Sequence, residues 1–434
     1  MTKTPADHPL RYSSANELHA RPFPEISAPC RAAFIATTLE PGADQRAKVR
    51  AHLLDLLDRH GADHPAPGAS HYSSKLGQLT LKWEGHSEFT TYTLFADGLT
   101  PDAFKGQLHE SFPKDWMAEM PGQVITSAIV RIEVEENETA IEKRLDSEMR
   151  QWFVGESLAA AYILDRSAVV ATDFRIDAGG HVRFAVLVKD GTGKRRIGRI
   201  VQRLLEIETY KCTAMLTLPV ARSVFSKAHA LDSELSGVVQ SMAREGDDAA
   251  ASLDRLLAVS ANVELLQSET SFRFSAGRAY REIVAQRVDV LREERVLGRQ
   301  LFSEFMMRRF DPAMRTCDAA QTRVSDLSAQ AARASDLLST RVGVAATEQN
   351  RRLLHRMNER AALQMRLQET VEGLSVVAVT YYAVNLLGYL LAPIAKGILP
   401  SKSWLMGILV VPVGLLVWML VRRIKARVAA KIDP

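Results

Sequence analysis

Cysteine is scarce in this chain of 434 residues. Its three cysteines, Cys30, Cys212 and Cys317, are far apart and fit no disulfide or metal-binding spacing. A fold held together by disulfides is therefore excluded, and the scarcity is consistent with a reducing compartment. The formal net charge is only +4, and the basic C-terminal tail is enough to account for it. We therefore expect no nucleic acid among the partners.

A recognisable catalytic motif is also absent. The sequence contains no Ser/His/Asp or Cys/His nucleophile set and no paired-carboxylate motif above chance. The stretch Gly191–Lys194 lies between a strand-like run and a helix, as a phosphate-binding loop does. However, Val188 stands where a Walker A motif has its first glycine, and Arg195 stands where it has Ser or Thr. We interpret it as a plain loop.

The segment that comes nearest to a metal-binding motif is a group of histidines. His60, His64 and His71 lie near Asp63, but the segment is rich in glycine and proline, so no helical face fixes their spacing. Solvated loop histidines are the favoured interpretation. The sequence thus predicts a protein that is not an enzyme and has no cofactor.

Charge is missing from two segments near the C-terminus. They are residues 374–394 (LSVVAVTYYAVNLLGYLLAPI) and 403–421 (SWLMGILVVPVGLLVWMLV). A run of about 20 apolar residues matches a hydrocarbon core of about 30 Å. Pro412 does not argue against a span, because membrane helices tolerate proline. We therefore expect a transmembrane hairpin over residues 374–421.

Basic residues predict how this hairpin is oriented. The tail 422–434 and the approach to the first span are rich in Lys and Arg, whereas the loop 395–402 has only two lysines. Both termini should therefore be cytoplasmic, and no cleavable signal peptide is expected. The tail is expected to contact the anionic inner leaflet. Its candidate lipid-contacting residues are Arg422, Arg423, Lys425 and Arg427.

The region 1–225 has the pattern of an α+β cytoplasmic domain with a mainly antiparallel sheet. Strand-like runs are expected at 32–39, 72–83, 89–95, 124–134, 169–176 and 182–188, with helices at 45–60 and from Gly193 towards Pro219. Turn signals between several neighbouring runs favour hairpins over parallel crossovers.

Residues 226–373 have the composition of a long helical stalk or coiled coil. Proline nearly vanishes, and apolar residues recur at helical spacing from Leu253 to Leu266. An Arg/Glu-rich run continues the helix to Phe310, where Asp311-Pro312 should break or kink it. A second helix should run from Ala313 into the first span. A helix this long has to pack on another helix, so we expect contacts with the 226–310 segment and with a second subunit.

Polar side chains mark one face of the first span. Ser375, Tyr382, Asn385 and Tyr389 share this face. Polar groups in lipid turn towards a bundle interior or a water-filled path, so the face serves either interhelical hydrogen bonding or a pore. Gly388 and Ala392 form a small-xxx-small pair that favours close helix packing.

The N-terminal segment NELHARPFP combines His, Arg, Glu and Phe on a proline-stiffened backbone. His19 and Arg21 are candidates for contact with an anion or a partner. The alternative is an arm that docks on the domain.

Four segments resemble a bacterial family of predicted membrane-anchored proteins with a domain of unknown function. They are HPLRYSSANELHARPFP, LLEIETYKCTAMLTLP, the run from TRVGVAATEQN to VAVTYY, and the terminal hairpin. The resemblance implies localisation to the bacterial inner membrane and supplies no activity. The architecture is also similar to CorA-type divalent-cation channels, which end the first span with a Gly-Met-Asn signature. Here Ala392-Pro393-Ile394 occupies that position, and the outer loop has two lysines and no acid.

Two hypotheses follow. The first is a membrane-anchored homo-oligomer whose non-catalytic cytoplasmic domain acts as a scaffold or regulator and binds a cytoplasmic protein. The alternative is a CorA-like ion transporter or channel with altered selectivity, lined by the first transmembrane helix.

Overall fold

A computed structural model gives the fold and describes residues 7–18, 22–39, 42–104, 108–242, 249–395 and 402–429. The chain divides into two compact units. The first comprises residues 1–247 and 251–335, and the second residues 248–250 and 336–434. The boundary that composition suggests after residue 225 falls inside helix α7 (Thr217–Met242).

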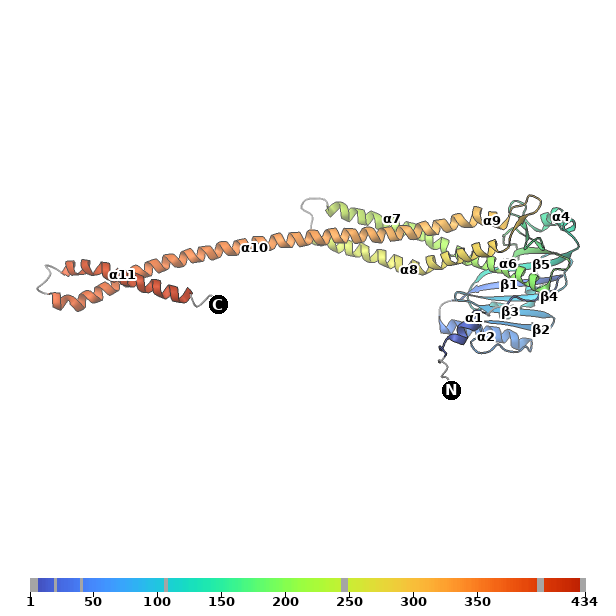
Figure 1. The fold of residues 1–434 in the computed structure, drawn as a ribbon, viewed down its shortest axis with the longest axis horizontal. Coiled ribbons are helices and arrows are strands. Elements are labelled where there is room, and N and C mark those ends of the chain that lie inside the picture. The colour runs from blue at the N-terminus through green and yellow to red at the C-terminus, as the bar shows by residue number, and fades with distance from the viewer. Residues whose placement is uncertain are drawn as a thin grey trace, which may run out of the picture. The chain divides into compact units, whose positions relative to one another are not determined.

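The first unit is built on a mixed sheet (Figure 1). Its nine strands in the described residues have the order β2-β3-β4-β1-β5-β8-β7-β6-β9. The strands are β1 (Cys30–Thr38), β2 (His71–Leu76), β3 (Leu79–Gly85), β4 (Phe89–Asp97), β5 (Val124–Glu135), β6 (Ala159–Ile163), β7 (Ala168–Thr172), β8 (Val182–Lys189) and β9 (Glu294–Arg295). Every neighbouring pair is antiparallel except β5 and β8, which are parallel. The expected α+β class with a mainly antiparallel sheet is confirmed.

Helices cover both faces of this sheet. They are α2 (Ala43–Arg59), α3 (Lys114–Ala118), α4 (Glu138–Ser147), α5 (Met149–Trp152), α6 (Lys194–Met215), α7, α8 (Ala249–Asp289) and α9 (Phe302–Phe305), with a 3-10 turn at His109–Ser111. Helix α1 (Arg11–Leu18) precedes them, and its described side chains are exposed. Successive side chains of a strand point to opposite faces. In β1, Phe34 packs in the core that includes α6, whereas Ile35 packs in the core that includes α2.

Two hydrophobic cores lie on the α2 side of the sheet, and each covers a different group of strands. Helix α2 buries Val49, Leu53, Leu56 and Leu57, the same apolar face that the sequence predicts. The short helices α4 and α5 bury Ile141, Leu145 and Met149 against β6, β7 and β8. Helices α4 and α5 and strand β6 were not predicted, because each is short.

The predicted strand runs need two corrections. The run 72–83 forms two strands, β2 and β3, because Gly77 takes a positive φ of 65° and turns the chain back on itself. The run 169–176 ends as a strand at Thr172, and only an isolated bridge from Ile176 to Val182 continues the pairing.

Helices α7 and α8 and the start of α10 (Asp311–Ala395) lie side by side (Figure 1). Arg281 of α8 contacts Asp318 of α10 at 2.7 Å, and Arg323 of α10 contacts Asp232 of α7 at 2.8 Å. The expected packing of the second long helix on the 226–310 segment is therefore confirmed for the start of α10.

The predicted continuous helix up to Phe310 is wrong. Helix α8 ends at Asp289, and the chain returns to the sheet, where β9 pairs with β6. A π-helical turn, Met306–Phe310, then leads into α10, which begins at Asp311 with Pro312 in its first turn. Leu291 and Phe302 are fully buried, so this return is part of the domain core.

The second unit holds the end of α10 and helix α11 (Lys402–Ala429). Two helices of the described chain are long and apolar enough to cross a membrane by length and composition, one that includes α10 and one over Met406–Ile424. The predicted helix without a break from Ala313 to Gly373 is confirmed, since α10 continues to Ala395.

Gly198→Ala should lower the free energy of unfolding by about 2 kcal/mol, because the new Cβ overlaps the backbone carbonyl of Pro24. Gly237→Ala is the control, since its Cβ meets open space in a helix and should raise stability by about 0.5–1 kcal/mol. Urea unfolding of both variants checks this. Equal stability of the two variants would show that the 22–29 segment does not press on α6.

Candidate functional site

The residues predicted to line a pore or a helix interface all lie on α10; they are Ser375, Tyr382, Asn385 and Tyr389. Ser375 Oγ donates to the carbonyl of Val371 at 2.8 Å, and Asn385 Nδ2 donates to the carbonyl of Tyr381 at 3.0 Å. These two bonds stay within one helix, so they do not provide the interhelical bonding considered for this face. Tyr382 and Tyr389 are 68% and 65% exposed.

A different face of α10 packs on α11. A Cβ on Gly388 would overlap the side chain of Met406, and a Cβ on Gly414 would lie 3.6 Å from Cγ2 of Thr380. Val384 is buried between Thr380 and Gly388, at the same spacing of four residues. Small residues at a helix interface allow close backbone approach, as the sequence predicts for Gly388. The tyrosine face therefore points away from this contact.

The other predicted contact residues fall partly outside the described residues. His19 and Arg21 both do. Arg422 and Arg423 belong to α11, where the Arg422 guanidinium lies 5.0 Å from the centre of the Trp418 ring. Lys425 and Arg427 are also in α11, but their side chains are not described.

The segment that follows His19 and Arg21 docks on α6. The backbone N–H of Ile26 donates to the carbonyl of Lys194 at 3.3 Å, and Glu25 pairs with Arg195 at 2.8 Å. Ile26 itself is 4% exposed. Glu25 and Ile26 therefore dock on the start of α6, and the two interpretations of His19 and Arg21 stay predictions. Glu25 and Ile26 also lie where a phosphate-binding loop would need free space.

This segment borders a cavity of about 350 Å³ in the first unit. Strands β1, β3 and β4 form its floor, and α6 forms its roof with Arg287 of α8. The residues that line it are Phe23, Pro24, Phe34, Lys82, Glu84, His86, Phe89, Thr91, Thr93, Phe95, Val201, Gln202, Leu205, Glu206, Thr209, Tyr210 and Arg287. Cavities of about 300–1,000 Å³ are the usual size of small-molecule sites.

A chain of polar contacts crosses one wall of the cavity. Lys82 Nζ lies 2.9 Å from Glu84 Oε1 and donates to Gln202 Oε1 at 2.8 Å. Gln202 in turn donates to Glu206 at 2.9 Å, and Arg287 pairs with the other oxygen of Glu206. The two cations and two anions neutralise one another. Sequence analysis missed this wall, although Lys82 and Glu84 alternate with apolar residues in β3.

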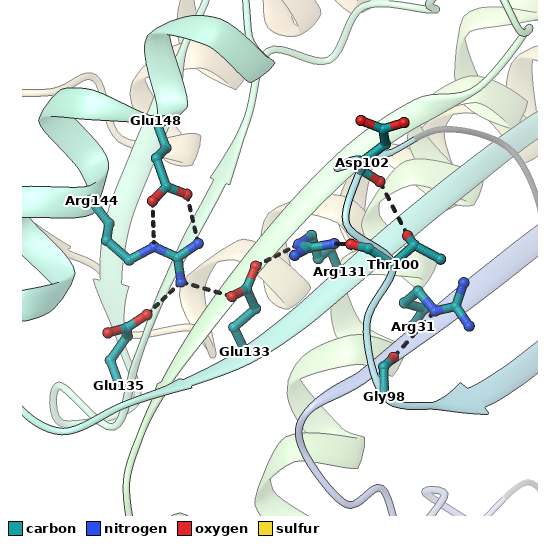
Figure 2. Close-up of polar contacts among 9 residues, drawn as sticks. All are labelled: Arg31, Gly98, Thr100, Asp102, Arg131, Glu133, Glu135, Arg144 and Glu148. Carbon is teal, nitrogen blue, oxygen red and sulfur yellow. Dashed lines mark hydrogen bonds and ion pairs between the residues drawn. The ribbon is translucent and has the colours of Figure 1, made fainter.

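A second polar network lies on the opposite face of the sheet (Figure 2). Arg144 of α4 binds Glu133, Glu135 and Glu148, and Arg131 of β5 binds Glu133 and the carbonyl of Thr100. Burial alone would raise the pKa of Glu133, but hydrogen bonds from Arg144 and Arg131 outweigh it and hold the pKa below its ordinary value. This network joins α4 to β5 and to the chain after β4, and we assign it a structural role.

Ser127, His109 and His181 form a cluster at the other end of β5. Ser127 Oγ donates to the carbonyl of Phe34 at 3.0 Å and lies 2.9 Å from His181 Nδ1. The serine hydroxyl is thus directed at the carbonyl of Phe34 as well as at His181. This geometry differs from that of a serine whose proton is held by a histidine base alone.

The two histidine rings stack with centroids 3.9 Å apart. Burial, and secondarily the neighbouring His181, lower the pKa of His109 to about 4. Burial also lowers the pKa of His181, against the opposing effect of Asp177. Both rings are thus neutral at pH 7.

The cysteines are poor nucleophiles. Burial, followed by nearby carboxylates, raises the pKa of Cys30 and of Cys212 to about 12. Both remain thiols at neutral pH, and the thiolate is the reactive form. Neither residue therefore supplies the chemistry of a cysteine enzyme.

Arg144→Met should lower the free energy of unfolding at pH 7 by about 3 kcal/mol, because it leaves Glu135 and Glu148 without an arginine and removes one of the two arginines that bind Glu133, whose side chain is only 11% exposed. Arg150→Met is the matched control, since its ion pair with Asp146 is 66% and 67% exposed and should matter by less than about 0.5 kcal/mol. Chemical unfolding measures both. The Arg144 effect should shrink as the pH falls through the pKa of Glu133, and an effect independent of pH would contradict the assignment.

His109 should make stability depend on pH. Its pKa is about 4 in the folded chain and about 6.5 in the unfolded chain. Its neutral form therefore stabilises the fold fully above about pH 6.5, and up to about 3 kcal/mol is lost as the pH falls towards 4. His109→Gln keeps an amide that can donate to the carbonyl of Ala128 and should flatten this part of the curve. The two chains are compared by unfolding at several pH values, and parallel curves would refute the assignment to His109.

Comparison with known proteins identifies the family of this chain. The profile of the family described as Protein of unknown function (DUF3422) matches residues 6–428. No curated protein and no solved structure matches the chain, so the expected architectural similarity to CorA-type channels receives no support. The chain belongs to the DUF3422 family, a domain-of-unknown-function family whose profile spans nearly its whole length.

Proposed function

We propose that the protein is a membrane-anchored homo-oligomer whose α+β domain acts in the bacterial cytoplasm as a non-catalytic scaffold or regulator. The observation that carries this proposal is the apolar surface of the second unit. Leu386 and Leu390 are 70% and 71% exposed in α10, and Val411 and Leu416 are each 66% exposed in α11. Exposed apolar surface of this extent needs lipid or a partner.

The contact between α10 and α11 supports lipid as the surroundings. The helices approach at Gly388 and Gly414, which removes the side-chain volume between their backbones. In lipid, close packing of this kind replaces the hydrophobic effect as the force that holds helices together. The basic residues Arg422 and Arg423 follow the second apolar segment, which supports a cytoplasmic C-terminus and contact with anionic lipid.

A second apolar surface supports the homo-oligomer. Leu363, Leu367 and Val371 recur every four residues on α10 and are 60%, 65% and 61% exposed. Residues at this spacing share one face of a helix. The face precedes the apolar segment and has charged residues around it, so a second copy of the same helix is the partner that fits it best.

The ion-channel alternative stays a prediction. None of the described contacts of Ser375, Tyr382, Asn385 or Tyr389 favours a pore over a packed helix interface. Binding of a cytoplasmic protein by the α+β domain is likewise part of the proposal only.

Leu386→Arg/Leu390→Arg in the first span, combined with Val411→Arg/Leu416→Arg in the second, should release the protein from membranes. Each arginine in the middle of a span costs about 3 kcal/mol of insertion free energy. The wild-type chain should stay in the membrane pellet after an alkaline carbonate wash, and this variant should move to the soluble fraction. Leu363→Arg/Leu367→Arg is the matched control and should stay in the pellet. A wild-type chain that carbonate extracts completely would refute the anchor.

Leu363→Arg/Leu367→Arg should instead dissociate the oligomer. The measurement is the mass of the detergent-solubilised protein by light scattering. Asn358→Arg/Ala362→Arg places the same charges on the opposite face of α10 and should leave the oligomer intact. A monomeric wild-type mass would remove the homo-oligomer from the proposal without affecting the anchor.

A further inference from the structure

We propose that the cavity between β4 and α6 is a binding site for a small, uncharged molecule with a planar aromatic body and one hydrogen-bond acceptor, such as a carbonyl oxygen. The inference goes beyond the membrane anchor and does not depend on it, because every residue it uses lies in the first unit.

The walls of the cavity select an aromatic body. Phe34 of β1 and Phe89 and Phe95 of β4 face it from the sheet, and Val201 and Leu205 face it from α6. Phe89 already meets the ring of Tyr210 edge to face at 5.7 Å. Aromatic rings gain from such edge and offset contacts, so a flat ring fits this wall better than a branched aliphatic chain.

The floor of the cavity offers donors to an acceptor. The Lys82 side chain is 8% exposed, and its ammonium group donates one hydrogen bond to Gln202 and lies 2.9 Å from Glu84 Oε1, so N–H donors remain for a ligand. Thr91 and Thr93 stand two residues apart on the same face of β4 and are each 4% exposed. Within the described part of the chain, neither threonine hydroxyl has a hydrogen-bond partner. Both threonines line the cavity, so a ligand oxygen bound there can accept hydrogen bonds from their hydroxyls.

The charges of the cavity exclude a charged ligand. Lys82 pairs with Glu84, and Arg287 pairs with Glu206, so the wall is neutral as a whole. A bound carboxylate or ammonium group would have to break one of these pairs or stay unpaired in a buried site. Either alternative costs more free energy than the charged group would gain from its contacts in the cavity. The site therefore discriminates by charge as well as by shape.

Binding is tested on the full-length protein in detergent by saturation-transfer NMR, with acetophenone as the probe. Benzoate has a similar size but is charged, and ethylbenzene has a similar shape but lacks the acceptor. We expect acetophenone to bind with a dissociation constant on the order of 1 mM, and the other two at least about tenfold more weakly. Equal binding of benzoate would overturn the charge argument and with it the proposal.

Two variants distinguish binding in the cavity from partition of the probe into detergent micelles. Val201→Phe fills the cavity and should abolish specific binding, so any signal that remains in it measures partition into micelles. Thr91→Val/Thr93→Val keeps the shape of both side chains and should reduce acetophenone binding to the level of ethylbenzene. Thermal unfolding of each variant shows whether it is folded. Undiminished acetophenone binding by folded Val201→Phe, or no wild-type binding at 10-fold the expected dissociation constant, refutes the site.

Discussion

Strand β1 has to bury both of its faces, and the rest of the first unit follows from this constraint. It lies between β4 and β5 near the middle of the sheet, and its residues from Ala32 to Ala36 are all buried. The sequence of a strand that is covered on both faces is nearly continuously apolar. One face needs α6 and the helices that pack on it, and the other needs α2. Helices α4 and α5 extend the same cover to the far half of the sheet.

Charged side chains are tolerated between these layers because each lies next to a group of opposite charge. On the α6 side, the chain from Glu84 to Arg287 lines a cavity, and on the other side Arg144 holds three glutamates together. The two networks differ in whether hydrogen-bond donors remain available to a ligand. In the Arg144 network the arginines bind carboxylates or a carbonyl at short distance. Around the cavity, Lys82, Thr91 and Thr93 retain donors, which is why the cavity and not the Arg144 network is the better binding site.

The periodic parts of this fold could be predicted and the short ones could not. The face of α2 formed by Val49, Leu53 and Leu57, and the long helix from Ala313, carry patterns that repeat over many residues. Strand β9 has only two residues, and its existence depends on pairing with β6, which lies more than a hundred residues earlier in the chain. A local pattern cannot contain such information. The continuous helix predicted up to Phe310 failed for this reason.

The sequence by itself determined the two charge-free segments, the basic residues beside them, the scarcity of cysteine and the helical character of the second half. These are properties of composition and spacing, which physical chemistry converts directly into local structure. Only the tertiary structure decided where distant residues meet. Gly198 is an ordinary helix residue until Pro24 lies against it, and Lys82 belongs to a cavity only because α6 places Gln202 above it. Such contacts depend on strand order and register, which the summed burial of the whole domain sets and no single segment encodes.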